Sequence, residues 1–263
     1  MPSRPVALVR EVPDSFVACV TSRPPVPPLD PSKARHQHAE YVAALEEGGF
    51  SVLKVPAAEE HPDCIFVEDV AVAFGRKALL TRPGHPSRRG ETAGVRTVLA
   101  DLVPVESMDE GSLDGGDVLH VGARVFVGLS ARTDATGIAV LARFFAPLEV
   151  IAVPVRATLH LKSGVSAVDA NTVLWHPAAC DRDDLVGLQV VEVPGDAPEA
   201  ANVVRLPDES VLVAAHHPVT ADLVASLGHK VRTVDVSEFA RADGGLTCLS
   251  VRIRSGRAVS SAP

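Results

Sequence analysis

Short valine-rich runs alternate with amphipathic segments along this chain, and this alternation limits its possible folds more than any other sequence feature. Runs rich in β-branched residues are typical of buried or half-buried strands. We expect strands at Val6–Val9, Val52–Val55, Ile65–Phe74, Ala78–Thr81, Val118–Val121, Val125–Gly128, Val150–Val153, Val165–Val168, Thr172–Trp175, Val190–Val193, Asn202–Leu206, Val211–Ala214 and Val231–Val236. Because helical segments lie between these runs, the pattern predicts an α/β protein.

Five helical segments separate the strands and return at similar intervals. We expect helices around residues 39–45, where Gly48-Gly49 ends the apolar stripe, around 95–102, after a cap at Thr133, over 181–188, and after a cap at Thr220. Their spacing of roughly 45 to 55 residues is typical of repeat architectures. No residue motif repeats with them, so an ordinary mixed α/β sheet fits equally well. The proline-rich Ser22–Pro31 is expected to be a surface loop, so residues 1–263 are predicted to be one domain.

The composition excludes several partners. The chain of 263 residues carries 25 Lys and Arg against 33 Asp and Glu, a formal charge of −8, which argues against nucleic acid or an anionic membrane. No apolar run approaches the roughly 18 residues of a membrane span, and residues 1–10 do not form a signal peptide. The four cysteines are far apart without a CxxC pair, so we expect a reduced, cytoplasmic protein.

Polar residues with catalytic chemistry interrupt apolar surroundings at several points. They are Asp63, Glu68 and Asp69 in "PDCIFVEDVAV", Arg88 in "TRPGHPSRRGE", Asp114 and Asp117 in "SLDGGDVLHVG", Arg132 in "GLSARTD", His160 in "ATLHLKSGVS", and Cys248 after "DGGLT". Carboxylates in a strand fit for burial are costly unless they meet a cation. Each residue alone also has an ordinary explanation, such as a surface arginine or a hydrogen-bonded core histidine. The "HHP" at 216–218 is interpreted as a strand end, and no metal site is predicted.

Six strings taken together are more specific than their single residues. In order, "FVEDVAV", "TRPGHPSRRGET", "LDGGDVLHVG", "VGLSARTDATG", "LHLKSGVS" and "DGGLTCLS" closely resemble the dimethylarginine dimethylaminohydrolase family of the guanidine-modifying (pentein) superfamily. The resemblance runs from about Val6 to Ile253. It implies a five-bladed α/β propeller in which each blade is one ββαβ unit around a central pocket. This favours the symmetric alternative that periodicity left open.

The resemblance also implies a role for each candidate residue. Cys248 would be the nucleophile and His160 the general acid and then base, oriented by Asp114, where some relatives carry glutamate. The implied substrate contacts are Asp63, Glu68 and Asp69 for the guanidinium and α-ammonium, Arg88 and Arg132 for the α-carboxylate, the backbone carbonyls of Val20 and Ala242, and Asp243, which would hold the cysteine loop or the substrate.

The implied activity is hydrolysis of Nω-methylated L-arginines to citrulline and a methylamine, through a covalent thiouronium on the cysteine. The alternatives are a related guanidine enzyme, such as an arginine or agmatine deiminase, and a propeller that binds without catalysis. The paired arginines argue against agmatine, and the compact length argues against arginine deiminase. We expect no cofactor and a small-molecule substrate, and zinc at Cys248 and His160 would be inhibitory. The sequence indicates no oligomeric state.

Overall fold

The computed structural model describes residues 4–75 and 77–253, whose strands form five three-stranded sheets. The strands are β1 (Val6–Arg10), β2 (Ser51–Val55), β3 (Ala71–Phe74), β4 (Lys77–Leu80), β5 (Val105–Ser107), β6 (Val118–Val121), β7 (Arg124–Leu129), β8 (Glu149–Pro154), β9 (Val165–Ala167), β10 (Thr172–Trp175), β11 (Gln189–Glu192), β12 (Val204–Arg205), β13 (Val211–Ala214), β14 (Val231–Val234) and β15 (Val251–Ile253). The helices are α1 (Pro31–Glu47), α2 (Thr92–Ala100), α3 (Ala135–Phe145), α4 (Pro218–Ser226) and α5 (Ser237–Ala240).

All five sheets have the same topology. The middle strand pairs antiparallel with one neighbour and parallel with the other, and a crossover segment joins the two parallel strands. In the first sheet β15, from the end of the chain, supplies the antiparallel strand, so Leu8 lies between Val251 and Leu53. The predicted α/β fold of five repeated three-stranded units is therefore confirmed, and the first and last described strands lie in one sheet.

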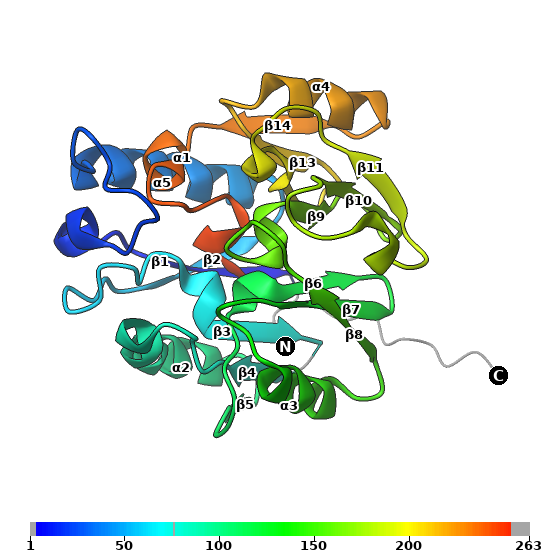
Figure 1. The fold of residues 1–263 in the computed structure, drawn as a ribbon. Coiled ribbons are helices and arrows are strands. Elements are labelled where there is room, and N and C mark those ends of the chain that lie inside the picture. The colour runs from blue at the N-terminus through cyan, green and yellow to red at the C-terminus, as the bar shows by residue number, and fades with distance from the viewer. Residues whose placement is uncertain (1–3, 76, 254–263) are drawn as a thin grey trace.

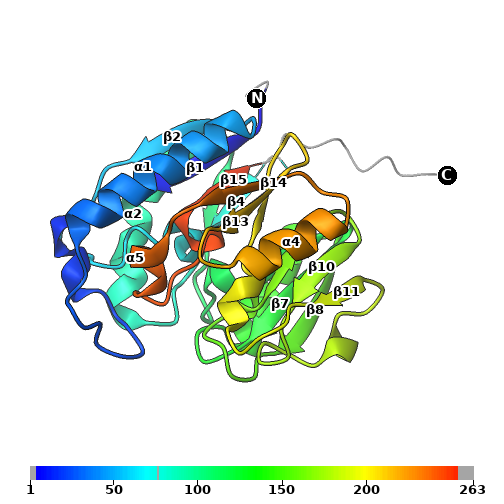
Figure 2. The same ribbon diagram turned by 90° about the horizontal axis from the view of Figure 1, so that it is seen from above.

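Helices α1 to α4 lie on the outside of the sheets (Figure 1 and Figure 2). In Figure 1, α1 to α4 occupy the periphery, and Figure 2 shows α1 lying along β1 and β2. Helix α2, for example, buries Val95 and Leu99 in one cluster with Leu80 of its own sheet and Leu8 of the first sheet. Valine, leucine and alanine dominate the buried clusters, as expected for a chain with 4% aromatic residues. No helix among the described residues is long and apolar enough to cross a bilayer.

Four sequence-based predictions of elements were wrong in part. The strand expected at Ile65–Phe74 begins only at Ala71, because Val67–Val70 forms a 3-10 turn that aims two carboxylates inward. The helix expected over 181–188 is only a 3-10 turn at Arg182–Asp184, since the chain bends at Gly187, where φ is 74°. The fourth unit therefore lacks an α-helix.

Two helix caps also differ from those predicted. Asp134, not Thr133, caps α3 by accepting a hydrogen bond from the Gly137 N–H at 2.8 Å. Helix α4 begins at Pro218, and Thr220 lies inside it, where its side chain is buried. Proline suits the first turn because it has no N–H to satisfy there. The strands β5 and β15 and the short helix α5 were not predicted, because each is too short to show a period.

Candidate active site

A 3-10 turn lies within two residues before the antiparallel edge strand of every sheet. The turns are η2 (Val67–Val70) before β3, η4 (Gly115–Asp117) before β6, η5 (Leu161–Ser163) before β9, η7 (Pro198–Ala201) before β12, and η8 (Thr247–Leu249) before β15. Turn η2 packs against η4 and η8, and η5 packs against η4 and η7. The repeated fold thus brings five segments, distant in sequence, to one place.

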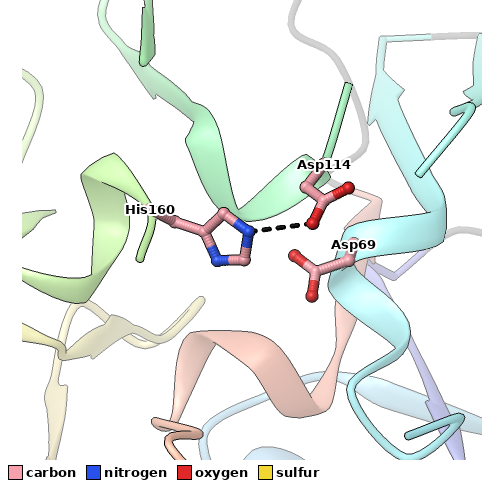
Figure 3. A group of neighbouring side chains, drawn as sticks. All are labelled: Asp69, Asp114 and His160. Atoms are coloured by element: carbon pink, nitrogen blue, oxygen red, sulfur yellow. Dashed lines mark hydrogen bonds and ion pairs between the residues drawn. The ribbon is translucent and has the colours of Figure 1, made fainter. Parts of the chain in front are cut away.

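His160 and Asp114 form a hydrogen-bonded pair at the starts of η5 and η4. The distance between His160 Nε2 and Asp114 Oδ2 is 2.9 Å, and both side chains are buried (Figure 3). The other oxygen of Asp114 accepts a hydrogen bond from the Gly84 N–H at 2.8 Å. With both oxygens engaged, Asp114 is held where it can orient the imidazole, and the catalytic role that the resemblance implies for it stays a prediction.

Asp69 lies next to Asp114, on the same side of the imidazole (Figure 3). It accepts hydrogen bonds from the Gly116 N–H at 2.9 Å and from Arg88 Nη1 at 2.5 Å. Burial alone would lower the pKa of His160, but Asp69, Asp114 and Asp117 raise it to about 9. The imidazole is therefore protonated at neutral pH, which is the form a general acid requires.

The pair Gly115-Gly116 permits this close approach. A Cβ atom on Gly116 would lie 2.7 Å from both Asp69 Oδ1 and His160 Nδ1, and one on Gly115 would lie 2.0 Å from the Glu68 carbonyl oxygen. Real Cβ atoms do not approach other atoms so closely. Glycine is required at both positions because the Asp69 side chain, the imidazole and the Glu68 carbonyl crowd the backbone.

Asp117 anchors the histidine turn, a role that the sequence did not indicate. Its side chain has no exposed surface, and Oδ1 accepts a hydrogen bond from the Leu161 N–H at 2.9 Å. Its other oxygen accepts from Ser130 Oγ at 2.7 Å and Thr133 Oγ1 at 2.6 Å. The available signal was a second carboxylate flanking the glycine pair, in a segment otherwise fit for burial.

Cys248 lies in η8, half-buried, and its Sγ accepts a hydrogen bond from the Gly245 N–H at 3.4 Å. Burial and the nearby carboxylates of Glu68 and Asp69 raise the pKa of the thiol to about 12. The thiol is therefore protonated in the free protein. A cation that neutralised those carboxylates would favour the thiolate.

Glu68 presents one unpaired oxygen in this region. Its Oε1 accepts hydrogen bonds from Lys162 Nζ at 2.5 Å and Arg252 Nη2 at 2.9 Å. Its Oε2 is buried and has no hydrogen-bond partner among the described residues. Because a buried carboxylate oxygen without a donor is unfavourable, this atom is suited to a cationic ligand. Lys162 and Arg252 were not predicted as part of the site, and no spacing in the sequence points to them.

The two predicted arginines differ in the partners they already have. Arg88 is buried and bonds Asp69 and both oxygens of Glu91, and it also reaches the carbonyls of Asp63 and Phe66. These contacts use at least four of its five N–H groups. Arg132 lies beside Asp114, with 3.6 Å between Nη1 and Oδ2. Arg132 is thus the better placed of the two to bind a carboxylate, and the binding roles of both remain predictions.

The remaining predicted contacts lie in the segments around Cys248 and Val20. Asp63 is buried and accepts a hydrogen bond from the Val20 N–H at 3.0 Å, and burial raises its pKa despite nearby Arg88. Asp243 is exposed, has a φ of 58° and accepts from Ser22 Oγ at 2.9 Å and from the Ser22 N–H. It therefore holds the Ser22 loop to the segment before Cys248. Ala242 is buried, and its carbonyl contact is untested.

One group in the site has the composition of a cation site. Ligand atoms of Asp69, Asp114 and His160 lie within 4.8 Å of one another. A metal would have to displace the proton of His160, whose pKa is about 9, and it would lie near Arg132 and Arg88. The group is therefore better suited to hold a proton than a metal ion.

Comparison with known proteins gives consistent results. A family model described as arginine deiminase matches residues 59–200. The N(G),N(G)-dimethylarginine dimethylaminohydrolase of Streptomyces coelicolor is 44% identical over 230 residues, covering 86% of this chain and 88% of that protein. The protein of the same name from Pseudomonas aeruginosa is 34% identical over 230 residues, covering 85% and 89%.

A solved structure agrees with these sequence matches. A cysteine-to-serine mutant of the Pseudomonas aeruginosa dimethylarginine dimethylaminohydrolase, complexed with citrulline, superimposes with a TM-score of 0.88 at 31% identity. The match covers 95% of this chain and 99% of that chain. The family resemblance found in the six strings is therefore confirmed over nearly the whole chain. This chain belongs to the dimethylarginine dimethylaminohydrolase family of the arginine deiminase (pentein) superfamily.

Proposed function

We propose that this protein hydrolyses Nω-methylated L-arginines to L-citrulline and dimethylamine or methylamine, with Cys248 as nucleophile. The observation that carries the proposal is the imidazolium of His160, held by buried carboxylates in the cluster of turns that also carries a half-buried thiol. Amine leaving groups need a proton, and guanidinium carbons need a strong nucleophile, so this combination suits cleavage of a C–N bond.

The substrate cation would activate the thiol. In the free enzyme the carboxylates of Glu68 and Asp69 oppose ionisation of Cys248. A guanidinium bound at the unpaired Oε2 of Glu68 would neutralise that charge, and the thiol would then release its proton to solvent. The thiolate forms only when substrate is bound, which protects the cysteine from other electrophiles.

The chemistry then proceeds in two halves. The Cys248 sulfur bonds to the guanidinium carbon, and the C–N bond to the methylated nitrogen breaks as His160 donates a proton to that nitrogen. Dimethylamine leaves, and a thiouronium remains on the cysteine. Neutral His160 next accepts a proton from water, which attacks the same carbon, and the C–S bond breaks to give citrulline. Asp114 keeps the imidazole oriented in both halves.

Binding at the amino-acid end would rely on Arg132, with Arg88 holding Asp69 in place. The carbonyls of Val20 and Ala242, with Asp63, are proposed to receive the α-ammonium, and Asp243 to fasten the neighbouring loop. All four cysteines are free, which supports the proposed cytoplasmic location. The fold of five units is proposed to act as one domain.

The test is a product assay by mass spectrometry on the purified protein. Asymmetric dimethylarginine, arginine and agmatine are supplied separately, and Cys248→Ser serves as the inactive control. Citrulline and dimethylamine from the first substrate alone are the expected result. Ammonia from arginine or agmatine would instead identify a deiminase. No product from any of the three would favour a binding protein.

A further inference from the structure

One turn of this group, η7, is followed by the buried Asn202, which was predicted only as the first residue of a strand. The other four turns carry or adjoin Glu68 and Asp69, Asp114, His160 and Cys248. Asn202 directly follows turn η7 and is 4% exposed. Because each turn precedes the antiparallel edge strand of its sheet, Asn202 occupies in its unit a place comparable to that of the proposed catalytic groups in theirs.

The amide of Asn202 joins two of those turns. Its Oδ1 accepts a hydrogen bond from the Thr247 N–H at 3.0 Å. Its Nδ2 donates to the Lys162 carbonyl at 2.8 Å and to Thr247 Oγ1 at 3.1 Å. Both amide N–H groups and the carbonyl oxygen are therefore engaged. Thr247 precedes Cys248, and Lys162 follows His160 by two residues, so one side chain links the nucleophile turn to the acid turn.

We propose that Asn202 is a positioning residue that sets the placement of Cys248 relative to His160. This inference rests on the proposed function, since it concerns the geometry of that reaction. The hydrogen bonds of the Asn202 amide go to Thr247 and Lys162, so it acts on Cys248 and His160 through those two residues. The Lys162 side chain also bonds Glu68, so the same link extends to the carboxylate with the unpaired oxygen.

The surrounding packing fixes the amide plane. A Cβ atom on Gly245 would lie 2.7 Å from both Cγ and Oδ1 of Asn202, so the cysteine turn lies directly against the amide. On the helix side, Tyr41 donates from its hydroxyl to the Leu246 carbonyl at 2.9 Å. Tyr41 therefore holds the nucleophile turn to α1, whereas Asn202 holds it to the acid turn.

The primary variant is Asn202→Ala, with Ser166→Ala as a matched control. Ser166 is also buried, and its Oγ accepts a hydrogen bond from the N–H of Val203, the next residue after Asn202, at 3.2 Å. The control thus removes a buried side-chain bond to the same segment without touching the cysteine turn. Small displacements of reacting groups can cost about 100-fold in rate. We expect Asn202→Ala to lower kcat about 10- to 100-fold with KM changed less than about threefold, and Ser166→Ala to keep kcat near that of the wild type.

The readouts separate positioning from loss of stability. Both variants should lower the melting temperature, but only Asn202→Ala should lower kcat. Equal kcat losses in the two variants, or a wild-type kcat for Asn202→Ala, would overturn the proposal. If Asn202→Ala does not fold, the nearly isosteric Asn202→Asp decides. That variant keeps the bond from Thr247 and places an oxygen against the Lys162 carbonyl, so kcat should fall at every pH. A fall that high pH reverses would show a charge effect on the thiol instead, and it would also overturn the positioning role.

The wild-type control separates this inference from the proposed function. If the wild type produces no citrulline from dimethylarginine, the proposed function fails first. If the wild type is active and Asn202→Ala matches it, only the positioning role is refuted.

Discussion

Replacing Asp114 with asparagine should lower the pH at which His160 loses the proton that it donates to the leaving group. The carboxylate lies 2.9 Å from His160 Nε2 and helps to raise the pKa of the histidine from 6.5 to about 9. Loss of an opposite charge at this distance lowers such a pKa by about 1–3. We therefore expect the pKa of His160 to fall to roughly 6–8. This fall means that the imidazolium is stabilised by about 1.4–4 kcal/mol less.

The size of the effect should depend on pH. With a histidine pKa near 9, about 90% of the wild type carries the imidazolium at pH 8, whereas with a pKa near 7 only about 10% does. The Asp114→Asn variant should therefore lose roughly tenfold more of its kcat at pH 8 than at pH 6. The asparagine oxygen can still accept from the Gly84 N–H, so the local fold should persist.

The assay is kcat for citrulline formation from pH 6 to 10, with Asp114→Glu as the control. Glutamate keeps the charge and changes only the geometry, so the midpoint of that variant should stay near that of the wild type. A midpoint for Asp114→Asn that remains at the wild-type value would refute the assignment of Asp114 as the partner that holds the proton on His160.

Three further predictions concern the same cluster. Because the pKa of His160 is higher in the folded chain than its ordinary 6.5, its imidazolium stabilises the fold fully below pH 6.5, and that contribution is lost as the pH rises through about 9. Urea denaturation should therefore show the stability advantage of the wild type over His160→Gln shrinking by up to about 3 kcal/mol between pH 6 and 9.5, and a constant difference would contradict this. Arg132→Ala should raise KM about tenfold or more with a smaller change in kcat, and an unchanged KM would mean that another group binds the carboxylate. Gly116→Ala should cost about 1–3 kcal/mol of stability and most of the turnover, since its Cβ would lie 2.7 Å from Asp69 and His160, and a variant with normal turnover would show that the backbone can move aside.

Much of the fold could be predicted from local pattern. The strands Val118–Val121, Thr172–Trp175 and Val211–Ala214 lie where their β-branched runs predicted them. Such strands are visible because a buried strand needs a continuous apolar run. At Ile65–Phe74 the same signal failed, since the apolar run there is buried as a turn and not as a strand.

The sequence by itself determined the family, the five-unit α/β fold and the residues expected to carry the chemistry, because the six strings and the hydrophobic runs are local features. Only the tertiary structure decided how their charges are used. Arg88 is largely occupied by Asp69 and Glu91, and Lys162 reaches a carboxylate 94 residues away. Asn202 lies 45 residues from the turn that it holds. Such partners leave no periodic signal in the sequence, because the closure of five sheets into one molecule, and not the neighbouring residues, brings them within hydrogen-bond distance.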